Sequence, residues 1–134
     1  MSRPLKCVLV VCGLLCIPGL ALGQPPTGTW KVNGNGHEGE LVIKSVAGIK
    51  VEGTIYGQPF VGAYDENTMR LNFLRVQDPK DPTTSQAWKG YLFQNAGEKE
   101  VKYTLAGTFE SFGEGGGAPR LEFGWFAQIT KPKE

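Results

Sequence analysis

Eight short stretches rich in β-branched and aromatic residues constrain the fold of this chain more than any other feature. Stretches of this composition, separated by Gly, Asn, Asp and Pro, are typical of β-strands. The expected strands cover residues 28–33, 39–45, 49–56, 59–64, 69–76, 86–94, 101–112 and 120–130. No window shows a convincing helical period, so we predict an all-β fold.

The links between these stretches are mostly short. Gly57-Gln58 fits a two-residue hairpin loop, and residues 46–48, 65–68 and 95–98 carry ordinary turn residues. Short links leave no room for parallel crossovers, so consecutive strands should pair antiparallel. Residues 77–85 and 113–119 form two longer links, rich in Pro and Asp and in Gly respectively, and we expect both to be loops.

Alternation of apolar and polar residues within the stretches indicates that each strand turns one face to a single core. The expected inward residues include Ile49, Val51, Ile55, Phe60, Tyr64, Met69, Leu71, Phe73, Arg75, Trp88, Leu92, Tyr103, Leu105, Phe109, Leu121, Phe123, Trp125, Ala127 and Ile129. The outward parity also holds apolar residues, namely Val61, Ala63, Tyr91, Phe93 and Phe126. If these cluster, they would form a contact between subunits of a homo-oligomer.

Glycine interrupts the inward face at positions 53, 62, 90 and 107. A glycine within a strand costs stability, so each position needs a reason. One reason is the sharp bending that closes a sheet into a small barrel, and a second, compatible reason is space for an internal cavity. Eight consecutive antiparallel strands predict an up-and-down β-barrel, which leaves no open edge, with a β-sandwich as the alternative.

The N-terminal residues have the pattern of a secretory signal peptide. Arg3 and Lys6 precede the apolar stretch 8–15, and small residues at 21–23 favour cleavage before Gln24. We therefore predict a signal peptide over residues 1–23, a single barrel domain over residues 24–134, and a secreted or periplasmic location. The apolar stretch is too short for a membrane span.

Charge and cysteine content exclude several classes of function. Removing Arg3 and Lys6 from the 14 basic residues leaves 12, against 13 acidic residues, so the mature chain has a net charge near −1 and no electrostatic preference for nucleic acid. Its cysteines all leave with the signal peptide, and His37 is its single histidine. We expect no metal site, no cofactor and no disulfide, and no Ser-His-acid pattern indicates an enzyme.

The Gly28-Thr29-Trp30 stretch, which opens the first expected strand, resembles the Gly-x-Trp motif of the calycins, a superfamily of small ligand-binding barrels. The avidin–streptavidin branch is the most similar in form, and lipocalins, fatty-acid-binding proteins and nitrobindin-type haem barrels are more distant. This resemblance implies an eight-stranded barrel with a ligand at one end. The Asn and Ser that avidins place after this Trp are not matched in register, because Val32 comes first, Asn33 follows, and Gly36 occupies the approximate Ser position. Biotin is therefore not supported by the pocket residues.

The candidate ligand-binding residues combine aromatic rings with polar groups near strand ends. They are Asn33, Tyr56, Asn72, Arg75, Trp88 and Trp125. Arg75 is expected to point inward, where it either closes one barrel end by stacking on an aromatic ring or meets an anionic ligand. Arg120 is the other candidate for the closing role. Tyr56 and Asn72 fall on the outward parity unless a bulge shifts the register.

These observations lead to two hypotheses of function. In the first, an exported barrel binds a small, partly apolar ligand at its open end, gated by residues 77–85 and 113–119. In the second, a barrel with a filled interior recognises or inhibits another macromolecule through its loops or its outer apolar residues.

Overall fold

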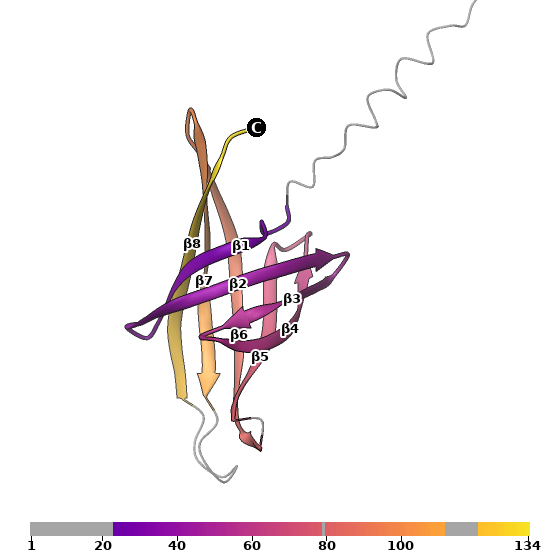
Figure 1. Cartoon of the computed structure of the whole chain (residues 1–134), viewed down its shortest axis with the longest axis vertical. Coiled ribbons are helices and arrows are strands. Elements are labelled where there is room, and N and C mark those ends of the chain that lie inside the picture. The colour runs from indigo at the N-terminus through magenta and orange to yellow at the C-terminus, as the bar shows by residue number, and fades with distance from the viewer. Residues whose placement is uncertain (1–22, 79, 112–120) are drawn as a thin grey trace, which may run out of the picture.

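The computed structural model describes residues 23–78, 80–111 and 121–134, and the signal-peptide prediction for residues 1–23 therefore falls almost entirely outside the described residues. The described residues form eight strands: β1 (Gly28–Gly34), β2 (His37–Ala47), β3 (Lys50–Ile55), β4 (Gln58–Asp65), β5 (Arg70–Asp78), β6 (Asp81–Ala96), β7 (Glu100–Ser111) and β8 (Leu121–Pro132). Figure 1 shows β1 and β2 running across the long strands β7 and β8.

The strands form a closed antiparallel barrel in which every strand pairs with its neighbours in the sequence. The barrel closes between the first and last strands, where Val32 lies opposite Ala127 and Gly34 lies opposite Trp125. Closure removes both sheet edges, as expected for a strand order without crossovers. The predicted antiparallel up-and-down barrel is confirmed, and the sandwich alternative is wrong.

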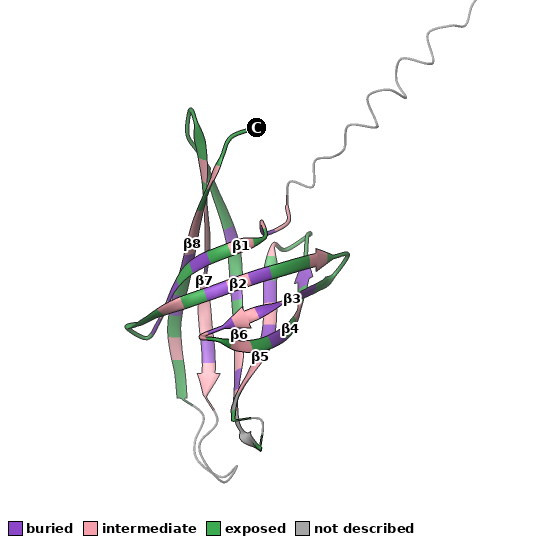
Figure 2. Ribbon diagram, in the orientation of Figure 1, coloured by how far each residue is buried: buried purple, intermediate pink, exposed green. Residues whose placement is uncertain are grey.

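The interior is a packed core of aliphatic and aromatic side chains. Its buried members are Trp30, Val32, Leu41, Ile43, Val51, Ile55, Phe60, Tyr64, Leu71, Phe73, Trp88, Leu92, Leu105, Phe109, Trp125 and Ala127. Figure 2 shows buried and exposed positions alternating along the strands, which is the two-residue period read from the sequence. Ile49 departs from that period and is 69% exposed, because it lies in the β2–β3 turn and not in β3.

The glycines on the inward face allow close approach between neighbouring strands. A Cβ atom at Gly53 would lie 1.9 Å from the carbonyl oxygen of Val42, and one at Gly107 would lie 2.0 Å from the carbonyl oxygen of Lys89. The space above Gly90 is filled by the indole of Trp125. These glycines therefore permit contact between strands, and the cavity explanation is wrong for Gly90, whereas the bending explanation stays a prediction.

The expected loop over residues 77–85 is mostly strand. β5 continues to Asp78, β6 begins at Asp81, and these two residues pair with each other. Extended pairing satisfies backbone groups that a loop would leave to solvent. The other expected loop, residues 113–119, lies outside the described residues.

The up-and-down topology places alternate turns at opposite ends of the barrel. We call the end that carries the β1–β2, β3–β4 and β5–β6 turns the mouth, and the end that carries the β2–β3, β4–β5 and β6–β7 turns the far end. None of the described residues form a helix that is long and apolar enough to cross a membrane.

Candidate functional site

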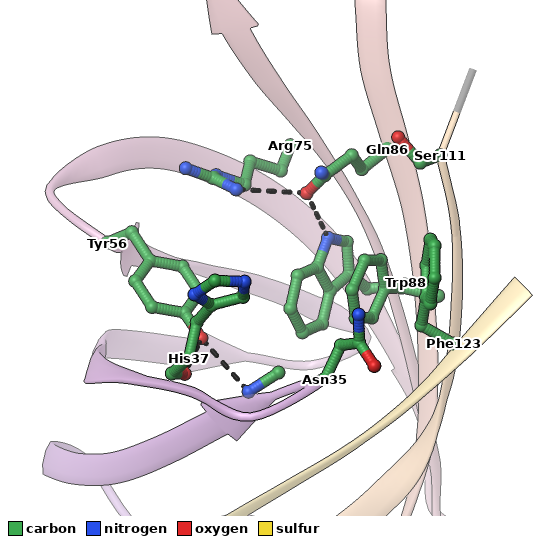
Figure 3. Close-up of a pocket in the computed structure, with 10 residues that line it drawn as sticks. Asn35, His37, Tyr56, Arg75, Gln86, Trp88, Ser111 and Phe123 are labelled. Carbon is green, nitrogen blue, oxygen red and sulfur yellow. Dashed lines mark hydrogen bonds between the residues drawn. The ribbon is translucent and has the colours of Figure 1, made fainter. Parts of the chain in front are cut away.

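A cavity of about 390 Å³ opens at the mouth. Its lining combines aromatic rings with polar side chains from six strands and the turns between them (Figure 3). The lining residues are Gly34, Asn35, His37, Tyr56, Arg75, Gln86, Trp88, Phe109, Ser111 and Phe123. Pockets for small molecules share this composition, with apolar walls and a few placed polar groups.

Tyr56 reaches this cavity because of the backbone conformation of the β3–β4 turn. Its φ of 50° lies in the left-handed region, which turns the side chain away from the outward face that simple alternation predicts. The ring then lies across Gly39, where a Cβ atom would be only 2.3 Å from Cε1 of Tyr56. A residue without a side chain at position 39 is therefore what allows Tyr56 to cover the side of the mouth.

The hydroxyl of Tyr56 ties the β3–β4 turn to the β1–β2 turn. It accepts a hydrogen bond of 3.0 Å from the Gly34 backbone N–H and donates one of 2.5 Å to the carbonyl oxygen of His37. One hydroxyl thus satisfies two backbone groups on opposite sides of the same turn. These contacts hold the rim of the cavity in a defined position.

Arg75 points into the mouth from β5, as predicted from its parity. Its Nε donates to Oε1 of Gln58 at 2.7 Å, and its Nη1 donates to Oε1 of Gln86 at 3.0 Å. The guanidinium lies 4.9 Å from the centre of the Tyr56 ring. The expected stacking of Arg75 on an aromatic ring is confirmed, and the ring is that of Tyr56.

Burial lowers the pKa of the Arg75 guanidinium, and the neighbouring Tyr56 acts in the opposite direction. Guanidinium groups titrate so far above neutral pH that this side chain stays charged. The three contacts that the structure gives Arg75 are all with uncharged groups. The mouth therefore holds a half-buried positive charge that these contacts do not cancel.

Gln86 is the buried polar residue that organises this side of the cavity. Its Oε1 accepts hydrogen bonds from Arg75 Nη1 at 3.0 Å and from Trp88 Nε1 at 3.2 Å (Figure 3). Two N–H donors converge on the same atom, so that atom must be the amide oxygen. Gln86 thereby links the charge of Arg75 to the aromatic core.

Two stacked rings, Trp88 and Phe109, form the floor of the cavity, and Phe73 stacks on Trp88 outside the lining. Trp88 lies between Phe109 and Phe73. The ring centroids of Trp88 and Phe109 are 4.1 Å apart with an interplanar angle of 8°, and those of Trp88 and Phe73 are 5.6 Å apart with an interplanar angle of 13°. Trp125 meets Trp88 edge-on, with the ring centroids 5.2 Å apart. Since both faces of Trp88 are covered, its indole presents an edge and not a face to the cavity.

The structure brings together three of the six candidate ligand-binding residues, namely Tyr56, Arg75 and Trp88. Asn33 is on the outward face, and its Oδ1 accepts a hydrogen bond of 2.8 Å from the Gly36 N–H of the β1–β2 turn. Asn72 lies outside with its neighbours Leu74 and Lys89. Trp125 is buried beneath the floor, where its Nε1 donates to the carbonyl oxygens of Lys89 and Thr108.

Several residues that line the cavity were not among the candidates from the sequence. Gln86 lies two residues before Trp88 on the same face of β6, and Ser111 lies two residues after Phe109 on the same face of β7, so parity alone could have indicated both. The single histidine, His37, is another lining residue. It is exposed, and it also borders the cavity. Of the two predicted gating segments, residues 77–85 are largely strand, and residues 113–119 are outside the described residues.

Within the described residues, no group of three or more His, Cys, Asp or Glu side chains is placed to hold a metal ion. Tyr56, Arg75 and Gln86 hold the rim through hydrogen bonds. The arrangement is suited to holding a molecule by contact and charge.

Comparison with protein-family models and with curated proteins finds no match to this chain. Among solved structures, the chain is similar to the crystal structure of a rhizavidin–biotin complex, with a TM-score of 0.48 and 11% sequence identity. The similarity covers 79% of this chain and 96% of that chain. It concerns the course of the backbone, and the function is argued below from the residues of the mouth.

Proposed function

We propose that this protein is an exported β-barrel that binds a small, partly apolar ligand at the mouth. The observation that supports the proposal is the cavity of about 390 Å³, walled by aromatic rings and bordered by the inward Arg75. This volume lies at the small end of the range for small-molecule pockets, so the ligand is compact.

The ligand binds at the rim and not deep inside the barrel. Trp30, Phe60 and Trp125 are each less than 5% exposed and occupy the interior beneath the mouth. The aromatic floor and Phe123 cover the apolar part of the ligand, and the polar groups on the side of Arg75 orient it. Burial of apolar surface supplies most of the affinity, and the polar contacts supply the orientation.

The proposal is for binding and not for catalysis. The hydroxyl of Tyr56 and the amide oxygen of Gln86 are each engaged in two hydrogen bonds that hold the rim together. A group held in this way positions its neighbours, whereas a general base or nucleophile must be free to reach a substrate.

A thermal-shift screen of residues 24–134 tests the proposal. The probes are biotin, haem, fatty acids and small aromatic compounds, and we expect at least one compact aromatic or aliphatic probe to raise the melting temperature. A ligand present at 100 times its Kd stabilises the folded state by about 2.7 kcal/mol, which is readily measured. If no probe changes the melting temperature, the proposal fails.

Two phenylalanines on β8 provide a matched pair of variants for that screen. Phe123 is half-buried in the lining, whereas Phe126 is 46% exposed on the outward face. Phe123→Ala should reduce the ligand-induced shift, and Phe126→Ala should keep it. Equal shifts in the two variants would place the ligand elsewhere.

Export is the second part of the proposal, and it depends on the residue pattern of positions 1–23. Expression of the full chain in a bacterial host, followed by N-terminal sequencing of the periplasmic or secreted protein, tests it. We expect the mature protein to begin at Gln24. Recovery of an intact N-terminus from the cytoplasm alone would contradict export.

The outer surface favours a second property, association into a homo-oligomer. Tyr91 and Phe126 flank Ala106 on adjacent strands, and Phe93 follows two residues after Tyr91. Tyr91 and Phe93 are 45% and 58% exposed. Light scattering of the wild type and of Phe93→Ser tests the proposal, and a monomeric wild type at micromolar concentration would contradict it.

A further inference from the structure

We infer that the ligand of the mouth is a monocarboxylate with a compact apolar body. This inference rests on the proposed function and specifies the chemistry of the same cavity. It depends on which polar atoms the rim has already used for its own hydrogen bonds and which kinds of atom it leaves to a ligand.

Arg75 provides the charge that selects an anion. Its contacts with Gln58 and Gln86 use two of the five N–H groups of a guanidinium. Those contacts and the Tyr56 ring fix the plane of the group without neutralising it. A fixed planar fork of donors matches the two oxygens of a carboxylate.

Gln86 can offer a ligand its amide N–H groups but not its amide oxygen. The amide oxygen already accepts two hydrogen bonds, which fills the capacity of a carbonyl oxygen. The amide group therefore presents its nitrogen to a bound molecule. Gln86 is 7% exposed and held by both Arg75 and Trp88, so this orientation is not free to reverse.

The hydroxyl of Tyr56, beside Arg75, is also in use. The Tyr56 hydroxyl donates to the carbonyl oxygen of His37 and accepts from the Gly34 N–H. A ligand that needed an acceptor from Tyr56 or Gln86 would have to break one of these hydrogen bonds. The part of the rim around Arg75 thus favours a ligand head that accepts hydrogen bonds and carries negative charge.

The charge of the cavity lies on one side, and the side opposite it carries Phe123 together with the uncharged Asn35 and Ser111. Figure 3 shows Arg75 and Tyr56 on one side of the cavity and Phe123 on the other, with Trp88 between them. A carboxylate at Arg75 directs the rest of the ligand toward Phe109 and Phe123. One guanidinium balances one negative charge, so a monoanion fits better than a phosphate dianion.

Paired probes that share an apolar body and differ in the head group, a carboxylate or a neutral amide, test the inference. The pairs are 2-naphthoate with 2-naphthamide and octanoate with octanamide, titrated calorimetrically into residues 24–134 at neutral pH. We expect the carboxylate of at least one pair to bind about tenfold or more tightly than its amide, as is typical when a hydrogen bond to a charged group is lost.

Two arginines on β5 supply a matched control. Arg75→Met should reduce the affinity for the carboxylate by about tenfold or more and leave the affinity for the amide nearly unchanged. Arg70 is exposed at the other end of the same strand, so Arg70→Met should change neither affinity. Comparable losses in both variants would indicate a general effect of net charge and overturn the inference.

Gln86→Glu gives a test that keeps the hydrogen-bonding geometry. A carboxylate at position 86 can accept from both Arg75 and Trp88 while it cancels the charge at the mouth. Carboxylate binding should fall by about tenfold or more, and amide binding should persist. A melting temperature close to that of the wild type shows that the variant has folded.

The outcomes separate the inference from the proposed function. If carboxylate and amide bind equally well, the anion inference is wrong and ligand binding at the mouth stands. If neither member of any pair binds while other neutral probes do, the inference is also wrong. If no probe of any kind binds, the proposed function itself fails.

Discussion

Replacement of Gly107 by alanine tests how this barrel is closed. A Cβ atom at position 107 would lie 2.0 Å from the carbonyl oxygen of Lys89 and 2.6 Å from Cα of Gly90, whereas ordinary van der Waals contact begins at 3.4 Å. Both neighbours are backbone atoms of the paired strand β6. They can yield only if β6 and β7 separate.

Separation of these strands also threatens the position of Trp125. Its Nε1 donates to the carbonyl oxygens of Lys89 at 3.0 Å and Thr108 at 3.2 Å, which come from the two strands that would move apart. Overpacking alone costs about 1–3 kcal/mol, and weakening a buried hydrogen bond adds about 1 kcal/mol. We expect Gly107→Ala to lower the free energy of unfolding by about 3 kcal/mol or more.

Urea unfolding followed by tryptophan fluorescence measures this loss, with Gly124→Ala as the control. Gly124 is exposed on β8, and a Cβ atom there would meet nothing closer than the carbonyl oxygen of Gly107 at 4.0 Å. The control should stay within about 0.5 kcal/mol of the wild type. If Gly107→Ala were equally neutral, or stabilising, the glycine would be leaving space and not permitting contact, and the argument for close strand approach would be refuted.

Two other side chains give predictions that follow from single atoms. Tyr64 is 1% exposed, and its hydroxyl has no hydrogen-bond partner among the described residues, so Tyr64→Phe should raise the free energy of unfolding by about 1 kcal/mol; a loss in urea unfolding would show that the hydroxyl has a partner. Burial, and then the charges of Glu66 and Asp65, raise the pKa of Tyr64 to about 12. The unfolded chain loses this proton near pH 10 while the folded chain keeps it, so wild-type stability should fall more steeply than that of Tyr64→Phe between pH 10 and 12; parallel curves would contradict this. Tyr56→Phe removes the partner of the Gly34 N–H and should cost about 1 kcal/mol, with faster hydrogen exchange of the Gly34 amide as the direct readout; an unchanged rate would argue against the contact.

The strand plan follows from the sequence because it depends on local information. Turn residues such as Gly48 and Gly57 mark where strands end, and alternation along each strand states which side chains face the core. Short links then leave consecutive antiparallel pairing as the simplest topology, and eight such strands avoid open edges by closing. The inward direction of Arg75 and Trp88 follows from the same alternation.

Contacts between residues that are distant in the sequence determine which side chains line the mouth. Tyr56 enters the cavity because a turn residue adopts positive φ and because Gly39, on another strand, leaves room for its ring. The orientation of the Gln86 amide is fixed by the hydrogen bonds that Arg75 and Trp88 donate to its oxygen. Alternation assigns a side chain to one of two faces, but the register and tilt of a closed barrel determine which inward residues meet at one end. Only the tertiary structure could therefore bring Tyr56, Arg75 and Trp88 together and leave Asn33, Asn72 and Trp125 outside the lining.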